Sequence, residues 1–253
     1  MEKITSRNNE KIKYACSLKK AGARKSEGKL LAEGLRLCLD AAENGVEIDF
    51  CFISEKELEN ERVKPILNAA KASFIIEEHI ALKLADTKNP QGIFCVCTPT
   101  PTEKRIDTNG KYILLENIAD PGNLGTAIRT AEAFGLSGAV LKGCCDVFSP
   151  KALRASMGAS FRFPVIEDDD MSVLRESLGK GMSLYCSVVD SDAEDVKSLR
   201  GKSGIFCAIG NEANGLSDEI KALGERITIH MRGRAESFNA SQAATVVMYE
   251  MTL

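Results

Sequence analysis

The chain has 253 residues, of which 44% are hydrophobic and 27% are charged, and its formal net charge is −3. These values are typical of a globular enzyme of one or two domains and exclude fibrous, repeat and largely disordered proteins. The N-terminus is too charged for a signal peptide, and no apolar stretch approaches the roughly 18 residues of a membrane span. We therefore expect a cytoplasmic protein with no membrane partner.

Cysteine and histidine usage gives no sign of a metal site or of disulfides. The chain has nine cysteines, an odd number, and no Cys-x-x-Cys motif. Most of the cysteines lie in apolar runs, and Cys144 and Cys145 are adjacent. The two histidines, His79 and His230, are not part of any cluster with ligand spacing. We expect reduced cysteines and no bound metal.

Positive charge is concentrated in residues 1–29, where nine Lys or Arg stand against three Glu. The segment carries a formal charge of +6, and the rest of the chain carries −9. A basic segment on an acidic protein is typical of proteins that bind phosphate groups. A basic helix that is merely solvated has the same composition.

Elements of an α/β domain follow in the N-terminal third of the chain. A helix through Leu35 and Ala42 is ended by Gly45, and strands near 48–53, 74–76 and 93–96 alternate with helices. The polar, proline-containing stretch after residue 98 then interrupts the apolar pattern. We predict a small domain over 1–98, a linker over 99–110 and a second domain over 111–253.

The second domain is predicted to be a parallel sheet covered by helices on both faces. Its expected strands alternate with helices and lie near residues 112, 139, 164, 184, 205 and 228. The fold class is therefore α/β throughout. Neither G-x-G-x-x-G nor G-x-x-x-x-G-K-[ST] occurs, so the dinucleotide-binding and P-loop classes lose their main support.

The first candidate site segment begins where the apolar strand 112–115 gives way to turn residues 117–123. The next helix carries Arg129 one turn past Gly125, from where its guanidinium can reach back over the helix N-terminus. A loop followed by a surface arginine is the alternative interpretation.

The second segment follows the buried strand 204–209 with a turn that contains Gly210, Glu212 and Gly215. Two glycines within six residues permit close approach of the backbone to a ligand. Glu212 is compatible either with a ligand contact or with capping the helix that begins near Ser217.

The third segment alternates Ile227, Ile229 and Met231, as a strand does, and then reaches Ser237 and Asn239. Ser237 is compatible with a helix N-cap as well as with a site residue. The last helix, 240–253, carries a single charged residue and is apolar almost all round. We expect it to be buried against other helices or against a second subunit.

Taken in order, these segments resemble the three signature motifs of the SpoU-type RNA methyltransferases. They read NIADPGNLGTAIRTAEAFG (117–135), IGNEANGLSDEI (209–220) and ITIHMRGRAESFNASQAATVVMYEM (227–251). The stretch 149–165 matches the part of the family between the motifs. Residues 28–45 and 86–96 resemble the substrate-binding domain of the ribosomal RNA 2′-O-methyltransferase branch.

The resemblance implies a C-terminal SPOUT domain with a trefoil knot, S-adenosyl-L-methionine as cofactor and a homodimer formed through the C-terminal domain. It also implies methyl transfer to a ribose 2′-hydroxyl of structured RNA, with ribosomal RNA as the first expectation. A transfer RNA 2′-O-methyltransferase is one alternative. A noncatalytic RNA-binding or ribosome-assembly protein with the same fold is another.

The motifs also assign residues to roles by position. The resemblance places Gly210, Ile229, Met231 and Phe238 around the cofactor, and its reacting side is formed by Asn123, Arg129, Glu212, Ser237 and Asn239. The family assigns proton removal to the residue that matches Arg129. Because a guanidinium normally keeps its proton, a phosphate clamp is the other role for this residue. Two departures from the family are Phe238, where Leu is usual, and Ala213, where Gly is frequent.

Overall fold

The computed structural model describes residues 1–99 and 105–253, which fall into two compact units. The first unit contains residues 1–99 together with Phe148–Arg162, and the second contains residues 105–147 together with Phe163–Leu253. Residues 100–104 of the predicted linker lie outside the described residues. The domain boundaries inferred from the sequence stay a prediction.

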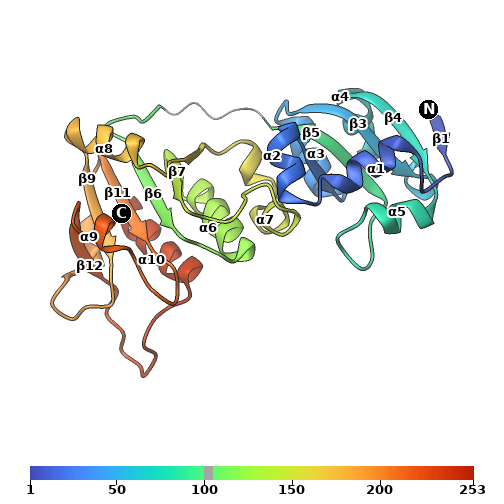
Figure 1. The fold of residues 1–253 in the computed structure, drawn as a ribbon. Coiled ribbons are helices and arrows are strands. Elements are labelled where there is room, and N and C mark those ends of the chain that lie inside the picture. Colours follow the sequence, from blue (N-terminus) through green and yellow to red (C-terminus); the bar gives the residue numbers. More distant parts are fainter. Residues whose placement is uncertain (100–104) are drawn as a thin grey trace. The chain divides into compact units, whose positions relative to one another are not determined.

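A five-stranded mixed sheet forms the first unit, in the order β1-β4-β3-β5-β2 (Figure 1). Strands β1, β4 and β3 are parallel, whereas β5 runs antiparallel to both β3 and β2. The bounds are β1 Glu2–Ile4, β2 Leu30–Glu33, β3 Glu47–Ser54, β4 Ala70–Ile76 and β5 Ile93–Thr98. The three predicted strands are present, while β1 and β2 are too short for their residues to show a clear alternation.

Helices cover both faces of this sheet. Buried side chains of α1 and α5 pack on one face, around Phe52 and Phe94. Those of α3 and α4 pack on the other face, together with Leu153 of α7. The helices are α1 Glu10–Ser17, α2 Ala21–Glu27, α3 Leu35–Glu43, α4 Lys64–Ala69, α5 Glu78–Leu84 and α7 Pro150–Ser156.

The basic N-terminal segment is an integral part of this unit. Ile4, Ile12 and Leu18 are buried in its core. Arg24 is also buried, and its Nη1 donates to the carbonyl oxygens of Leu18 and Lys19 at 2.8 and 2.7 Å. Residues 1–29 are therefore not a separate arm, and any phosphate contact must come from the exposed lysines and arginine of a folded surface.

A seven-stranded sheet with parallel pairing throughout forms the second unit, in the order β10-β12-β9-β11-β6-β7-β8. The bounds are β6 Lys111–Glu116, β7 Gly138–Lys142, β8 Val165–Glu167, β9 Ser183–Ser187, β10 Glu194–Asp195, β11 Ile205–Ile209 and β12 Glu225–Thr228. All six predicted strands are confirmed, and the two-residue β10 was not predicted.

Two pairs of helices cover this sheet, as predicted. Helices α8 (Ser172–Gly179) and α9 (Asp218–Lys221) pack on the face that holds Val140, Leu184 and Phe206. Helix α6 (Pro121–Ala133) packs against the C-terminal helix α10 (Ala240–Thr252), whose Ala244, Val247, Met248 and Met251 are fully buried. The trefoil knot stays a prediction. Among the described residues, no helix is long and apolar enough to cross a membrane.

Two element boundaries differ from the sequence-based expectation. Helix α6 begins at Pro121, because Asp120 accepts a hydrogen bond from the backbone N–H of Asn123 at 3.0 Å and Pro121 has the backbone angle of a first helical residue. Asn123 therefore lies in the first helical turn. Strand β12 ends at Thr228, because its pairing with β9 ends at Ile227 and its pairing with β10 ends at Thr228. Ile229 consequently continues as loop.

Candidate active site

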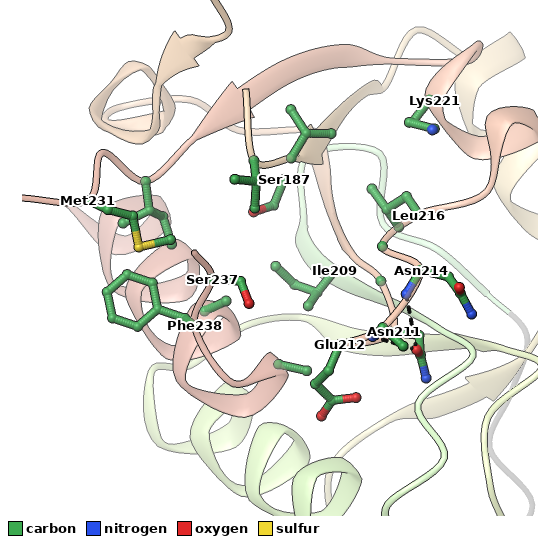
Figure 2. Close-up of a pocket in the computed structure, with 18 residues that line it drawn as sticks. Ser187, Ile209, Asn211, Glu212, Asn214, Leu216, Lys221, Met231, Ser237 and Phe238 are labelled. Carbon is green, nitrogen blue, oxygen red and sulfur yellow. Dashed lines mark hydrogen bonds between the residues drawn. The ribbon is translucent and has the colours of Figure 1, made fainter. Parts of the chain in front are cut away.

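A cavity of about 380 Å³ opens beyond the carboxyl ends of β9, β11 and β12 in the second unit (Figure 2). Its walls are formed by residues 187–189 and 209–216, together with Lys221, Ile229, Met231, Ser237, Phe238, Ala240 and Ala243. Ligands of parallel α/β sheets bind at this edge, because the loops that leave the strands converge there.

All four residues expected around the cofactor line this cavity: Gly210, Ile229, Met231 and Phe238. Met231 and Phe238 lie on the same side of it in Figure 2, and the Phe238 side chain is 39% exposed. The walls thus combine apolar side chains with backbone groups of the 210–216 loop. The role of these residues as cofactor ligands stays a prediction.

The 210–216 loop is held in a tight turn. A Cβ on residue 210 would lie 2.2 Å from the carbonyl carbon of Gly215, so only glycine fits there. Asn211 organises the turn, because its carbonyl oxygen accepts from the N–H of Gly215 and its Oδ1 accepts from the N–H of Ala213, both at 2.8 Å. Ala213 keeps a negative φ, so it fits where glycine is frequent without left-handed strain.

Glu212, at the tip of this loop, accepts a hydrogen bond from Nδ2 of Asn123. It does not cap α9. That position belongs to Ser217, whose Oγ accepts from the N–H of Ile220 at 3.3 Å. The structure therefore excludes the capping interpretation of Glu212, and its contact with a ligand stays a prediction.

Asn239 links the third motif to the first. Its Nδ2 donates to Oδ1 of Asn123 at 3.2 Å, and its own Oδ1 accepts from the N–H of Ser241 at 3.0 Å, which caps α10. Because Asn239 is the cap, Ser237 is not, and Ser237 instead lines the cavity. Asn123, Glu212 and Asn239, one from each motif, thus form a connected cluster of polar side chains.

Arg129 is not brought to this cluster. It lies on the exposed surface of α6, six residues after Asn123 and about 9 Å farther along the helix axis. It does not line the cavity, and it makes no hydrogen bond or ion pair with any residue in 1–99 or 105–253. An exposed, unpaired guanidinium is available to a ligand outside the pocket.

Glu116, the last residue of β6, was not predicted as part of the site. Its side chain is fully buried and accepts hydrogen bonds from both the N–H and the Oγ of Ser217 at 2.7 Å, and from Nζ of Lys142 at 2.9 Å. Burial by itself would raise the pKa of Glu116, but the bonds from Lys142 and Ser217 outweigh it and hold the pKa below its ordinary value. The feature of the sequence that could have indicated it is a glutamate at the end of an otherwise apolar strand.

No group of three or more His, Cys, Asp or Glu among the described residues is arranged to hold a metal ion. The nine cysteines are free, and burial raises the pKa of Cys186 to about 11 and that of Cys144 to about 12. Both thiols are therefore protonated near neutral pH.

Comparison with known proteins agrees with the three motifs. The model of the SpoU rRNA Methylase family matches residues 110–249, and that of the MRM3-like substrate binding domain matches residues 9–95. The 23S rRNA (guanosine(2553)-2′-O)-methyltransferase RlmP of Bacillus subtilis is 27% identical, with 99% of each chain covered. The 23S rRNA (uridine(2479)-2′-O)-methyltransferase of Streptomyces viridochromogenes is 29% identical, over 98% of this chain and 91% of its own length.

A solved structure is similar over both units. The AdoMet-bound rRNA methyltransferase from Sinorhizobium meliloti has a TM-score of 0.86 and 27% sequence identity, and covers 99% of this chain and 97% of its own. The resemblance inferred from the motifs is thereby confirmed, and so is the SPOUT-type fold of the second unit. The chain belongs to the SpoU rRNA methylase family of RNA methyltransferases.

Proposed function

We propose that the protein transfers the methyl group of S-adenosyl-L-methionine to a ribose 2′-hydroxyl of ribosomal RNA. The observation that carries the proposal is the cavity built by the second and third motifs beside the Asn123–Glu212–Asn239 cluster. Relatives that span the whole chain are named for this reaction on 23S rRNA.

The cavity fits this cofactor in size and chemistry. Its volume of about 380 Å³ lies within the range of small-molecule sites. Ile209, Ile229 and Met231 offer apolar contact to a flat base and to the carbon chain of the cofactor, while the backbone groups of the 210–216 loop offer hydrogen bonds. We assign Gly210, Ile229, Met231 and Phe238 to holding the cofactor, which supplies an electrophilic methyl group when bound.

The chain's own contribution is alignment and exclusion of water. In-line displacement needs the attacking oxygen, the carbon and the sulfur on one axis, and positioned groups provide much of the rate enhancement of such reactions. Asn123, Glu212 and Asn239 hold the loops of the three motifs in register, and Ser237 presents a hydroxyl at the cavity wall. These residues would form the surface against which the ribose is seated.

We assign Arg129 to the RNA side of the reaction, as a clamp on a substrate phosphate. Its exposure and its lack of a partner in the described chain support a role toward an incoming ligand. A guanidinium makes two parallel hydrogen bonds to a phosphate and keeps its own proton. The 2′-hydroxyl proton would then pass to Ser237, to water or to a substrate phosphate.

We also infer a homodimer formed through the C-terminal domain. Tyr249 of α10 is 48% exposed and lies against the Phe134 ring at a centroid distance of 6.0 Å, which leaves an aromatic surface on the α6–α10 pair. The mass of the protein in solution, compared with that of Tyr249→Asp, tests this inference. A monomeric wild-type protein would reject it.

Labelled methyl transfer tests the proposed function. Ribosomal and transfer RNA from cells that lack the protein are incubated with labelled S-adenosyl-L-methionine and either wild-type enzyme or Arg129→Ala. We expect label in ribosomal RNA with the wild-type enzyme alone. Label in transfer RNA alone would favour the tRNA methyltransferase alternative. The absence of both transfer and cofactor binding would favour the noncatalytic RNA-binding alternative.

A further inference from the structure

The cavity wall formed by the 210–216 loop is bound at both ends to two consecutive residues: Glu116, the last residue of β6, and Asn117, the first residue of the first motif. At the start of the loop, Nδ2 of Asn211 donates to the carbonyl oxygen of Asn117 at 3.0 Å. Just beyond its end, both the N–H and the Oγ of Ser217 donate to the carboxylate of Glu116 at 2.7 Å. Figure 2 shows Asn211, Glu212, Asn214 and Leu216 of this loop at the cavity.

The backbone at the end of β6 has an uncommon conformation. Asn117 adopts the left-handed region at φ 55°, and its own N–H donates to the carbonyl oxygen of Lys142 at 2.8 Å. Gly143 lies against it, and a Cβ there would be 2.3 Å from the Asn117 Oδ1. A non-glycine residue with positive φ costs conformational energy, so the surrounding contacts must hold it in place.

Glu116 does not line the cavity, but its carboxylate accepts three hydrogen bonds, two from Ser217 at the end of the cavity loop and one from Lys142. A fully buried carboxylate costs free energy unless it is paired. Three bonds from Ser217 and Lys142 provide that pairing. Because Ser217 is also the N-cap of α9, one carboxylate fixes both the end of the loop and the start of the next helix.

We propose that Glu116 is a positioning residue for the cofactor: its carboxylate, bound to Ser217, holds the 210–216 loop in the shape that binds S-adenosyl-L-methionine. The inference rests on the proposed cofactor pocket and adds a residue that does not touch it. Loss of this carboxylate weakens cofactor binding and leaves Asn123, Ser237 and Asn239, which lie outside the loop, in place.

The isosteric change Glu116→Gln tests this role sharply. Each carboxylate oxygen faces a donor, Oε2 the N–H of Ser217 and Oε1 the ammonium of Lys142. Whichever way a glutamine amide is turned, its NH₂ group therefore meets another donor. A buried donor left without an acceptor is unfavourable, so the amide and its neighbours must move and the loop shifts with Ser217. We expect the affinity for the cofactor to fall about tenfold or more.

The matched control is Asp168→Asn, which makes the same kind of change at another strand end of the same sheet. Asp168 is also buried, and its carboxylate accepts from the N–H groups of Val173 and Leu174 at 3.0 and 2.9 Å. It follows β8, the edge strand at the end of the sheet away from β9, β11 and β12, and it does not line the cavity. This variant therefore reports on loss of stability alone.

The experiment measures cofactor binding by calorimetry, thermal stability, and the KM and kcat of the whole 253-residue chain. We expect Glu116→Gln to raise the Kd and the KM for S-adenosyl-L-methionine about tenfold or more, with a smaller effect on kcat at saturating cofactor. Asp168→Asn should lower the melting temperature without changing the Kd. Ser217→Ala, which keeps the N–H donor, should raise the Kd by a smaller factor.

An unchanged Kd in Glu116→Gln would overturn the inference. So would an equal rise in Kd in Asp168→Asn, because the effect would then follow from stability. If Glu116→Gln does not fold, an unchanged Kd in Ser217→Ala has the same meaning. Failure of the wild-type protein to bind S-adenosyl-L-methionine would instead reject the proposed function itself, which keeps the two failures apart.

Discussion

The side chain of Asn239, the N-cap of α10, donates to that of Asn123 in the first turn of α6 at 3.2 Å. The two residues are 116 positions apart in the sequence. Oδ1 of Asn239 accepts from both the N–H and the Oγ of Ser241, so the Asn239 side chain donates to Asn123 through its Nδ2. Nδ2 of Asn123 is then left to donate to Glu212. A chain of bonds with one direction therefore connects all three motifs.

Replacing Asn123 by Asp should break this chain while keeping the shape of the side chain. The new carboxylate would face Glu212, and two adjacent carboxylates repel each other. We expect methyl transfer to fall about 100-fold or more, as when a positioned group is lost, while the Kd for the cofactor changes little because Asn123 does not line the cavity. Asn109→Asp, at an exposed asparagine of the same unit, is the control. Equal activity of the two variants would contradict the role of the cluster.

The two glycines of the cofactor loop should respond differently to alanine. Gly210→Ala places a Cβ 2.2 Å from backbone atoms of Gly215, whereas the Cβ of Gly215→Ala meets nothing within 4 Å. Gly215 has φ +65°, so its replacement costs only about 1 kcal/mol of backbone strain. Calorimetry should show that Gly210→Ala loses cofactor binding and that Gly215→Ala retains it. Retention by both variants would show that the loop does not form the binding surface.

Arg129→Ala should separate catalysis from cofactor binding. Because Arg129 lies on the exposed face of α6 and outside the cavity, we expect an unchanged Kd for S-adenosyl-L-methionine. Methyl transfer should fall about 100-fold or more, the usual effect of removing a group that positions the substrate or stabilises charge. Arg129→Lys keeps the charge but not the bidentate fork, so partial activity would favour the phosphate clamp. Full activity of Arg129→Ala would remove this residue from the site.

The exposed lysines of the N-terminal segment should contribute to RNA affinity through phosphate contacts. Lys20 and Lys25 are exposed, whereas Arg24 between them is buried and bound to carbonyl oxygens. We expect Lys20→Glu with Lys25→Glu to weaken RNA binding and to reduce its dependence on salt by about one unit of slope per lost contact. The same reversal at Lys180 and Lys197 of the second unit is the control. An unchanged slope would exclude this surface from RNA binding.

Cys144 should resist alkylation although it is only half-buried. Burial is the main cause that raises its pKa to about 12, and its thiol donates to the carbonyl oxygen of Leu115 at 3.1 Å. A thiol with this pKa is almost wholly protonated at pH 8, and the thiolate is the reactive form. Mass spectrometry after iodoacetamide treatment at pH 8 should find Cys144 unmodified in the native protein and modified in denaturant. Rapid native labelling would contradict the protonated state.

Much of the fold and the outline of the site could be predicted from the sequence, because strands of the second unit are continuous apolar runs and the motifs place turns directly after them. The boundary of β12 could not, since Ile229 alternates correctly with Ile227 but has no neighbouring strand to pair with. Glu116 was missed because its acceptor role depends on Ser217, about a hundred residues away. The burial of Arg24 was likewise missed, since composition alone does not distinguish a guanidinium bound to carbonyl oxygens from a solvated one.

The measurement that tests the central claim most directly is the identity of the nucleoside that receives the methyl group. Ribosomal RNA labelled by the wild-type enzyme is digested to nucleosides, which are separated and identified by mass. The account predicts that the label is found in one 2′-O-methylated nucleoside and is absent after reaction with Arg129→Ala. Label in a base-methylated nucleoside, with the ribose unmodified, would contradict it.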